Sequence, residues 1–96
     1  MHVISYKAIR EFKAARSDAG AALDNWYRVS SSCEWKSFGE LRQVFASADW
    51  INPYVVFNIA GNKYRLIAEV NFRSQTIFVR HILTHEEYAE GKWKKP

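Results

Sequence analysis

The dipeptide Gly61-Asn62, flanked by two alternating segments, constrains the fold of this 96-residue chain more than any other feature. Gly-Asn between apolar segments is typical of a two-residue β-hairpin turn, which would set Asn58 opposite Arg65. In this register one face of both strands is apolar, and a slip of one residue would mix it with polar side chains. That face comprises Val55, Phe57, Ile59, Tyr64, Leu66, Ala68, Val70 and Phe72. We therefore predict a β-hairpin that packs one face against a core.

The other face of the predicted hairpin is mostly polar. It comprises Asn58, Lys63, Arg65, Glu69, Asn71 and Arg73, with Val56 and Ile67 among them. If Ser74-Gln75 is a second two-residue turn, a third strand follows. In that register Arg80 faces Glu69, which gives Arg80 a structural role in an ion pair. Arg65 then faces Thr84 and is a cation in the middle of this face with no acid opposite it.

The N-terminal half predicts a short strand and a pair of helices. Val3-Ile4 fits a strand, and Ser5 is a candidate N-cap for the helix that follows. Two segments with apolar residues at helical spacing are separated by Ser17-Asp18 and Gly20, so they should form an αα-hairpin with one apolar side. The basic residues of the first helix are interpreted as a solvated face, and these are Lys7, Arg10, Lys13 and Arg16.

Turn and cap signals divide the rest of the chain. The three serines at 30–32 favour a loop. Residues 37–40 and 84–87 each have the pattern of a capping box and predict two short helices, the second ended by Gly91. Residues 92–95, with three lysines, are interpreted as a mobile basic tail. The element order predicts an α+β fold in one domain, residues 1–96: a small antiparallel sheet with the helical hairpin on one face and a short C-terminal helix.

Composition narrows the class of protein. The net charge of +4 favours an anionic partner such as nucleic acid. Cys33 is the single cysteine, so no intramolecular disulfide or thiolate metal site is possible, which fits a reducing cytosol. The three histidines lack metal-ligand spacing, and we expect no cofactor. The N-terminus is too charged for a signal peptide and no apolar segment has transmembrane length, so we expect a cytoplasmic protein without membrane contact.

The strongest candidates for chemistry lie between Lys63 and Tyr88. His85 and Tyr88 are three residues apart, so they share one side of the last helix, near Arg65 in the register above. Such a group suits an RNA phosphodiester: cations stabilise the phosphate charge, His85 exchanges a proton, and Tyr88 stacks on a base or relays a proton. Because no metal site is evident, cleavage would be metal-independent and would use the ribose 2′-OH as nucleophile.

The same residues could instead have structural roles. His85 could be an ordinary first residue of a helix, and Tyr88 could simply pack that helix onto the sheet. His81 faces the packed side in this register and is interpreted as a histidine at the edge of the core. At the level of function, a non-catalytic basic module that binds RNA or an acidic protein is the main alternative to an enzyme. A DNA-binding regulator is less well supported, because the chain has no helix-turn-helix signature.

Three motifs carry a resemblance to a known family. They are the F-N-x-x-G-N hairpin at 57–62, the R-L-I-A strand at 65–68 and T-H-x-E-Y at 84–88. With the N-terminal strand and helices, their order and spacing cover nearly the whole chain. The chain resembles the HigB family of bacterial type II toxins, within the RelE-like superfamily.

The resemblance implies a function. Such toxins are ribosome-dependent mRNA endoribonucleases, or mRNA interferases, that inhibit translation. A cognate antitoxin, usually a HigA-like helix-turn-helix protein, neutralises them, and the complex represses its own promoter. The partners implied are therefore this antitoxin and mRNA on the ribosome, with DNA reached only through the antitoxin.

The resemblance also implies residue roles. Arg65 matches the strand arginine that contacts the scissile phosphate, while His85 and Tyr88 fall where relatives place catalytic side chains. Some relatives have lysines on the strand before the hairpin, where this chain has only Asn58, and Lys63 is the nearest substitute. HigB relatives often have an aspartate at the position of Ala89. The general base is therefore not assigned. The predicted catalytic residues are His85, Arg65 and Tyr88, and the predicted substrate-binding residues are Lys63, Arg73, Asn58, Lys92, Lys94 and Lys95.

Overall fold

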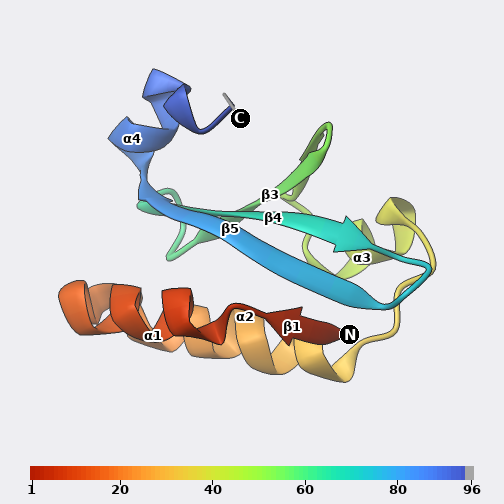
Figure 1. The fold of residues 1–96 in the computed structure, drawn as a ribbon. Helices are drawn as coiled ribbons and strands as arrows, with labels where there is room; N and C mark the ends of the chain where they lie inside the picture. Colours follow the sequence, from red (N-terminus) through yellow and green to blue (C-terminus); the bar gives the residue numbers. More distant parts are fainter. Residues whose placement is uncertain (95–96) are drawn as a thin grey trace.

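The computed structural model describes residues 1–94 and confirms an α+β fold (Figure 1). A five-stranded sheet has the order β1-β5-β4-β3-β2. The helices α1 and α2 lie antiparallel along one side of this sheet, and α4 rises on the other side at the end of β5. The elements are β1 His2–Ile4, α1 Tyr6–Ala15, η1 Ser17–Ala19, α2 Gly20–Ser32, α3 Phe38–Val44, β2 Asp49–Ile51, β3 Tyr54–Ile59, β4 Tyr64–Asn71, β5 Thr76–Thr84, α4 His85–Glu90 and η2 Lys92–Lys94.

The sheet is antiparallel in its sequential pairs and parallel at one edge. Strands β2 to β5 pair antiparallel with their neighbours, as expected for strands joined by short turns. Strand β1 instead pairs parallel with the start of β5, through His2 with Thr76 and Ile4 with Phe78. No hairpin joins these two strands, because the helices and three other strands lie between them in the chain. The direction of β1 is therefore set by tertiary packing.

The register predicted for the first hairpin is confirmed. Asn58 lies opposite Arg65, and Phe57 lies opposite Leu66. The apolar face of the hairpin packs against α1 and α2, where Phe57 and Leu66 are at most 1% exposed. The ring of Trp26, from α2, meets Phe57 edge-on at 5.3 Å between centroids. A local turn signal and a continuous apolar face therefore suffice to place β3 against β4.

The register predicted for β5 is wrong. The two strands close at the pair Asn71–Thr76, so the loop has four residues, 72–75, in place of a two-residue turn. Within this loop Gln75 has a positive φ of 56°. Its side-chain nitrogen, Nε2, donates to the backbone carbonyl of Trp35 at 2.6 Å. A contact from outside the hairpin thus holds the longer loop, which local turn rules do not predict. As a result Arg65 lies opposite Leu83, and Thr84 lies opposite Tyr64.

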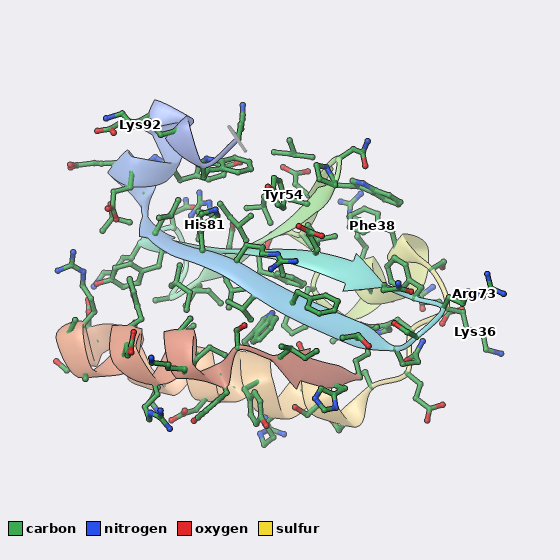
Figure 2. All side chains as sticks on the ribbon, in the orientation of Figure 1. Lys36, Phe38, Tyr54, Arg73, His81 and Lys92 are labelled. Atoms are coloured by element: carbon green, nitrogen blue, oxygen red, sulfur yellow. The ribbon has the colours of Figure 1, made fainter. Side chains whose placement is uncertain are left out.

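A β-bulge at Arg80 changes the face on which His81 lies. Ala68 pairs with Val79 and Ile67 pairs with His81, so Arg80 is left without a partner in the ladder. The extra residue reverses the alternation, and His81 lies on the α4 side of the sheet rather than on the packed side, as Figure 2 also shows. The expected ion pair survives the shift, because Arg80 Nε is 3.1 Å from Glu69 Oε1.

Three of the predicted helix ends differ in detail. Ser5 has φ 76° and its side chain makes no cap hydrogen bond. The serines at 30–32 belong to α2 because Ser30 is fully buried and the Ser32 hydroxyl donates back to the carbonyls of Arg28 and Val29. The Ser37 hydroxyl accepts from the Glu40 amide as expected. The Glu40 carboxylate, however, accepts from the backbone amide of Lys36 and not from that of Ser37, as a capping box would require.

The C-terminal segment is anchored rather than mobile up to residue 94. Trp93 is 4% exposed and forms a second, smaller apolar cluster with Val56 and Ile67 on the face of the sheet away from α1 and α2. Its ring stacks on Tyr88 at 5.2 Å. Residue 95 of the predicted tail lies outside the described residues. Between residues 1 and 94, no helix combines the length and the apolar character that crossing a bilayer requires.

Candidate functional site

A pocket of about 420 Å³ opens where the turn between α1 and α2 approaches the β3–β4 turn and the start of α4. We call it the His85 pocket. It combines basic, acidic, aromatic and hydroxyl side chains from three parts of the chain. Its lining comprises Arg16, Lys63, Tyr64, Thr84, His85 and Glu86. Two residues predicted from the sequence, Lys63 and His85, are therefore brought together here.

A capping box positions His85. The Thr84 amide donates to Glu87 Oε1 at 2.9 Å, and the Glu87 amide donates to Thr84 Oγ1 at 3.1 Å, as the sequence predicted. The His85 amide donates to the Lys63 carbonyl at 3.0 Å, which ties the start of α4 to the β3–β4 turn. No hydrogen bond to the imidazole is found within residues 1–94. Its nitrogens are therefore available to a ligand in the pocket.

The opposite wall of the pocket is held by Asp18, from η1. The Tyr64 hydroxyl donates to Asp18 Oδ1 at 2.7 Å, and Lys63 Nζ lies 3.4 Å from Asp18 Oδ2. The hydrogen bond from Tyr64 lowers the pKa of Asp18 below its ordinary value, and Lys63 adds to this effect. The same bond raises the pKa of Tyr64, so its proton stays in place. These contacts fix Lys63 at the pocket edge and join the helical hairpin to the sheet.

Arg65 lies outside the pocket and is largely buried. It is 8% exposed, and its Nη1 donates to the carbonyls of Asn62 and Tyr64, both at 3.2 Å. Its Nη2 donates to Asn62 Oδ1 at 3.3 Å, and its Cζ lies 5.3 Å from the centre of the Tyr88 ring. No acid lies opposite Arg65 in the ladder, as predicted, but its side chain is buried rather than open to solvent. The guanidinium folds back onto the hairpin turn and is shared between carbonyls and an aromatic face.

Tyr88 belongs to the same packed group as Arg65. Its ring lies between the Arg65 guanidinium and Trp93, and its carbonyl accepts from Trp93 Nε1 at 2.9 Å. Tyr88 does not line the His85 pocket. The predicted catalytic group is therefore divided: His85 faces the pocket with Lys63, whereas Arg65 and Tyr88 pack together on the sheet face that Trp93 covers.

Two predicted substrate contacts lie away from the pocket. Arg73 is on the β4–β5 loop, eight residues past Arg65, and a strand rise of about 3.3 Å per residue separates the two by roughly 25 Å. Figure 2 shows Arg73 at the opposite end of the sheet from Lys92. Asn58 faces Arg65 across the hairpin and lines a separate hollow with Trp26.

The lysines of the C-terminal segment also lie away from the His85 pocket. Lys92 Nζ is 3.6 Å from Glu90 Oε2, and Lys94 Nζ lies 5.5 Å from the Trp93 ring centre. Lys95 is outside the described residues. In the described part of the chain, no three His, Cys, Asp or Glu side chains gather in a group that could hold a metal ion.

Sequence reasoning missed Arg16 as a residue of the pocket. Its helical phase placed it with the basic residues of α1, which were interpreted as solvated. In the structure it stands between α1 and η1, where the helix ends and the chain turns toward the sheet. The signal in the sequence was its place directly before the Ser17-Asp18 break. Only the packing of that break against the β3–β4 turn brings Arg16 to Lys63 and His85.

Comparison with known proteins identifies the family. The matching family model describes a RelE-like toxic component of a toxin-antitoxin system and covers residues 19–91. The chain belongs to the HigB toxin family. An mRNA interferase HigB from Escherichia coli O6:H1 (strain CFT073) is 33% identical over 91 residues, which are 92% of this chain and 88% of that protein. The mRNA interferase toxin HigB of Escherichia coli K12 is 31% identical over the same shares.

Membership of this family has direct consequences. The expected family is confirmed, and the expected class of enzyme is confirmed at the level of the family, whose relatives are named as mRNA interferases. A toxic component of a toxin-antitoxin system implies an antitoxin partner. The roles of individual site residues stay predictions.

The capping box of Thr84 and Glu87 predicts that the stability of the fold depends on pH. The hydrogen bond from the Thr84 amide lowers the pKa of Glu87 below its ordinary value. A lowered folded pKa means that the box stabilises the fold fully above about pH 4.3, the ordinary glutamate value, and that this contribution is lost as the pH falls through the folded pKa. Urea unfolding from pH 6 to pH 2.5 should therefore show a smaller acid loss in Glu87→Gln than in the native chain. Asp18→Asn is the companion variant: the hydrogen bond from Tyr64 lowers the pKa of Asp18 as well, so this change should also reduce the acid loss. If Glu87→Gln loses as much stability in acid as the native chain does, the capping box is not the cause of the acid loss.

Proposed function

We propose that this toxin is an endoribonuclease that cleaves messenger RNA on the ribosome, with the His85 pocket as its catalytic centre. The observation that carries the proposal is the meeting of a free imidazole with basic side chains around a pocket of about 420 Å³. A histidine titrates near neutral pH and suits proton transfer, and cations stabilise the charge that develops on phosphate. The relatives' name, mRNA interferase, supports RNA as the substrate.

The proposed reaction is an internal transesterification. The ribose 2′-oxygen attacks the adjacent phosphorus, the bond from phosphorus to the 5′-oxygen breaks, and a 2′,3′-cyclic phosphate and a 5′-hydroxyl form. A base takes the proton from the 2′-hydroxyl and an acid gives a proton to the departing 5′-oxygen. His85 performs one of these transfers, and Lys63 stabilises the negative charge on the phosphate oxygens. The reaction needs no metal ion, because the nucleophile is supplied by the substrate.

Arg65 and Tyr88 support this centre from the other side of the β3–β4 turn. Arg65 holds the carbonyls of Asn62 and Tyr64, which flank Lys63 in the chain. The Lys63 carbonyl in turn accepts from the His85 amide. Arg65 therefore acts on the reaction by holding the turn in place, and Tyr88 packs on its guanidinium. A base that stacked on Tyr88 would have to displace Trp93 or approach an edge of the ring.

The remaining predicted contacts are assigned to RNA outside the pocket. Arg73, Lys92 and Lys94 lie on exposed parts of the molecule, where they would contact phosphates away from the scissile nucleotide. Asn58 and Lys95 keep their predicted role as substrate contacts. Because ribosome-bound mRNA is the proposed substrate, the protein acts in the cytoplasm.

We further propose that a cognate helix-turn-helix antitoxin of the HigA type neutralises this toxin. Contact with DNA then arises only through that partner. The family implies an antitoxin, and its helix-turn-helix nature is a hypothesis that co-purification of the neighbouring gene product with this chain would test.

The decisive experiment uses purified toxin, ribosomes and a short mRNA in the decoding site. We expect new 5′ ends on all-RNA substrate and a 2′,3′-cyclic phosphate on the upstream product. A 2′-deoxynucleotide at the cleaved position should block cleavage, although binding persists. Binding to ribosomes without any new 5′ end would instead support the alternative, a non-catalytic module. Cleavage of the 2′-deoxy substrate would overturn the proposed use of the 2′-hydroxyl.

A further inference from the structure

Arg16 is an exposed residue that lines the His85 pocket from the side of the helical hairpin. Its backbone is held on both sides, because its amide donates to the Phe12 carbonyl at 2.8 Å and its carbonyl accepts from the Ala19 amide at 3.0 Å. Its guanidinium carbon lies 6.0 Å from the centre of the Phe12 ring, and that ring packs edge-on against Tyr64 at 5.2 Å. A stack of two aromatic rings thus supports the guanidinium beside the pocket.

The charge of Arg16 reaches both other walls of the pocket. A hydrogen bond to Asp18 raises the pKa of Tyr64, and the positive charge of Arg16 opposes this rise. A hydrogen bond from Thr84 lowers the pKa of Glu87, and Arg16 acts in the same direction. Arg16 therefore faces β4 and the start of α4 together, as its place in the pocket lining requires.

Arg16 is also free of a carboxylate partner among the residues that the structure describes. Two acids of this part of the fold are engaged elsewhere: Asp18 pairs with Lys63, and Glu87 accepts from the Thr84 amide. Glu86 lines the same pocket but forms no ion pair with Arg16 within 4.0 Å. Lys63 shares its charge with Asp18, so Arg16 is the cation of the pocket that is most available to an anionic ligand.

We propose that Arg16 is a catalytic residue that binds the non-bridging oxygens of the scissile phosphate opposite His85, an inference that rests on the proposed function. A guanidinium presents two parallel N–H donors that match two phosphate oxygens. Held on the Phe12 ring, it meets the growing charge of the transition state with little reorganisation. The catalytic centre then extends from the start of α4 to the end of the first helix of the helical hairpin.

The test compares Arg16 variants in single-turnover cleavage on ribosomes. Arg16→Ala should lower kcat/KM by roughly a hundredfold, mostly through kcat, as expected for a group that stabilises transition-state charge. Arg16→Lys keeps the charge without the two-pronged geometry and should recover part of that loss. Arg10→Ala is the matched control, because Arg10 is an exposed arginine of α1 that does not line the pocket. It should cleave at the native rate.

The outcomes separate the two proposals. If Arg16→Ala cleaves at the native rate while His85→Ala and Lys63→Ala are impaired, the inference on Arg16 is wrong and the proposed function stands. If the native chain makes no cut, or if His85→Ala and Lys63→Ala cleave normally, the proposed function fails first. Arg16→Met keeps the aliphatic stem on Phe12 and guards against a folding defect. Loss of cleavage in Arg16→Met, with native urea unfolding, supports the inference, and native cleavage overturns it.

Discussion

Replacing His85 with alanine should slow ribosome-dependent RNA cleavage by roughly 10²–10⁴-fold, the usual contribution of a positioned acid or base. Among the side chains that line the His85 pocket, the imidazole is the one best suited to proton transfer in a catalytic step. The substitution keeps the backbone amide that donates to Lys63, and alanine is well tolerated in the first turn of a helix. The fold should therefore survive while the chemistry is lost. The measurement is the single-turnover rate at saturating ribosomes, together with growth after induction in cells.

His2→Ala is the control for this prediction. His2 is an exposed histidine of β1 that pairs with Thr76, at the other end of β5 from α4. Its replacement should leave cleavage unchanged, which separates loss of the pocket imidazole from loss of a histidine in general. Binding of His85→Ala to the antitoxin should show that the surface of the toxin is intact. If His85→Ala cleaves at the native rate, another residue of the pocket is the acid or base, and Glu86 is the first candidate.

Arg65→Ala should lower the free energy of unfolding by roughly 2–4 kcal/mol, because it removes hydrogen bonds from a charged donor, one of them to the buried Tyr64 carbonyl, and a cation–π contact. The carbonyls of Asn62 and Tyr64 would lose their shared partner, and Tyr88 would lose the guanidinium on its ring. Urea unfolding should show a lower midpoint with an unchanged slope. Cleavage should fall as well, since the β3–β4 turn that carries Lys63 is no longer held.

Arg80→Ala supplies the matched control for stability. Arg80 is an exposed arginine of the same sheet, and its ion pair with Glu69 is worth at most about 1 kcal/mol. Arg65→Lys keeps the charge but cannot reach several acceptors at once, so it should recover only part of the stability. If Arg65→Ala unfolds like the native chain and yet fails to cleave RNA, Arg65 contacts the substrate directly, as the family resemblance implied. The supporting role proposed for it here would then be wrong.

The accuracy of the sequence predictions follows the range of the interactions behind them. The β3–β4 hairpin was predictable because two turn residues and one alternating pattern specify it locally. The capping box at Thr84 and Glu87 was predictable for the same reason. The register of β5 was not, because it depends on a bulge at Arg80 and on Gln75, whose side chain reaches Trp35, a residue 40 positions away. No pattern within the hairpin contains that information.

The candidate site likewise has features that local sequence predicts and features that depend on long-range packing. The sequence alone determined the α+β class, the resemblance to the family, and the choice of His85 and Lys63, since residue type and local spacing carry each of these. Only the tertiary structure decided that Arg65 is buried beside Tyr88 and that Arg16 lines the same pocket as His85. The physical reason is that both outcomes depend on how separate elements pack. The hydrogen bonds from Lys63 and Tyr64 to Asp18 hold the end of the first helix against the β3–β4 turn, 45 residues away in the chain. Local propensities contain no information about that contact.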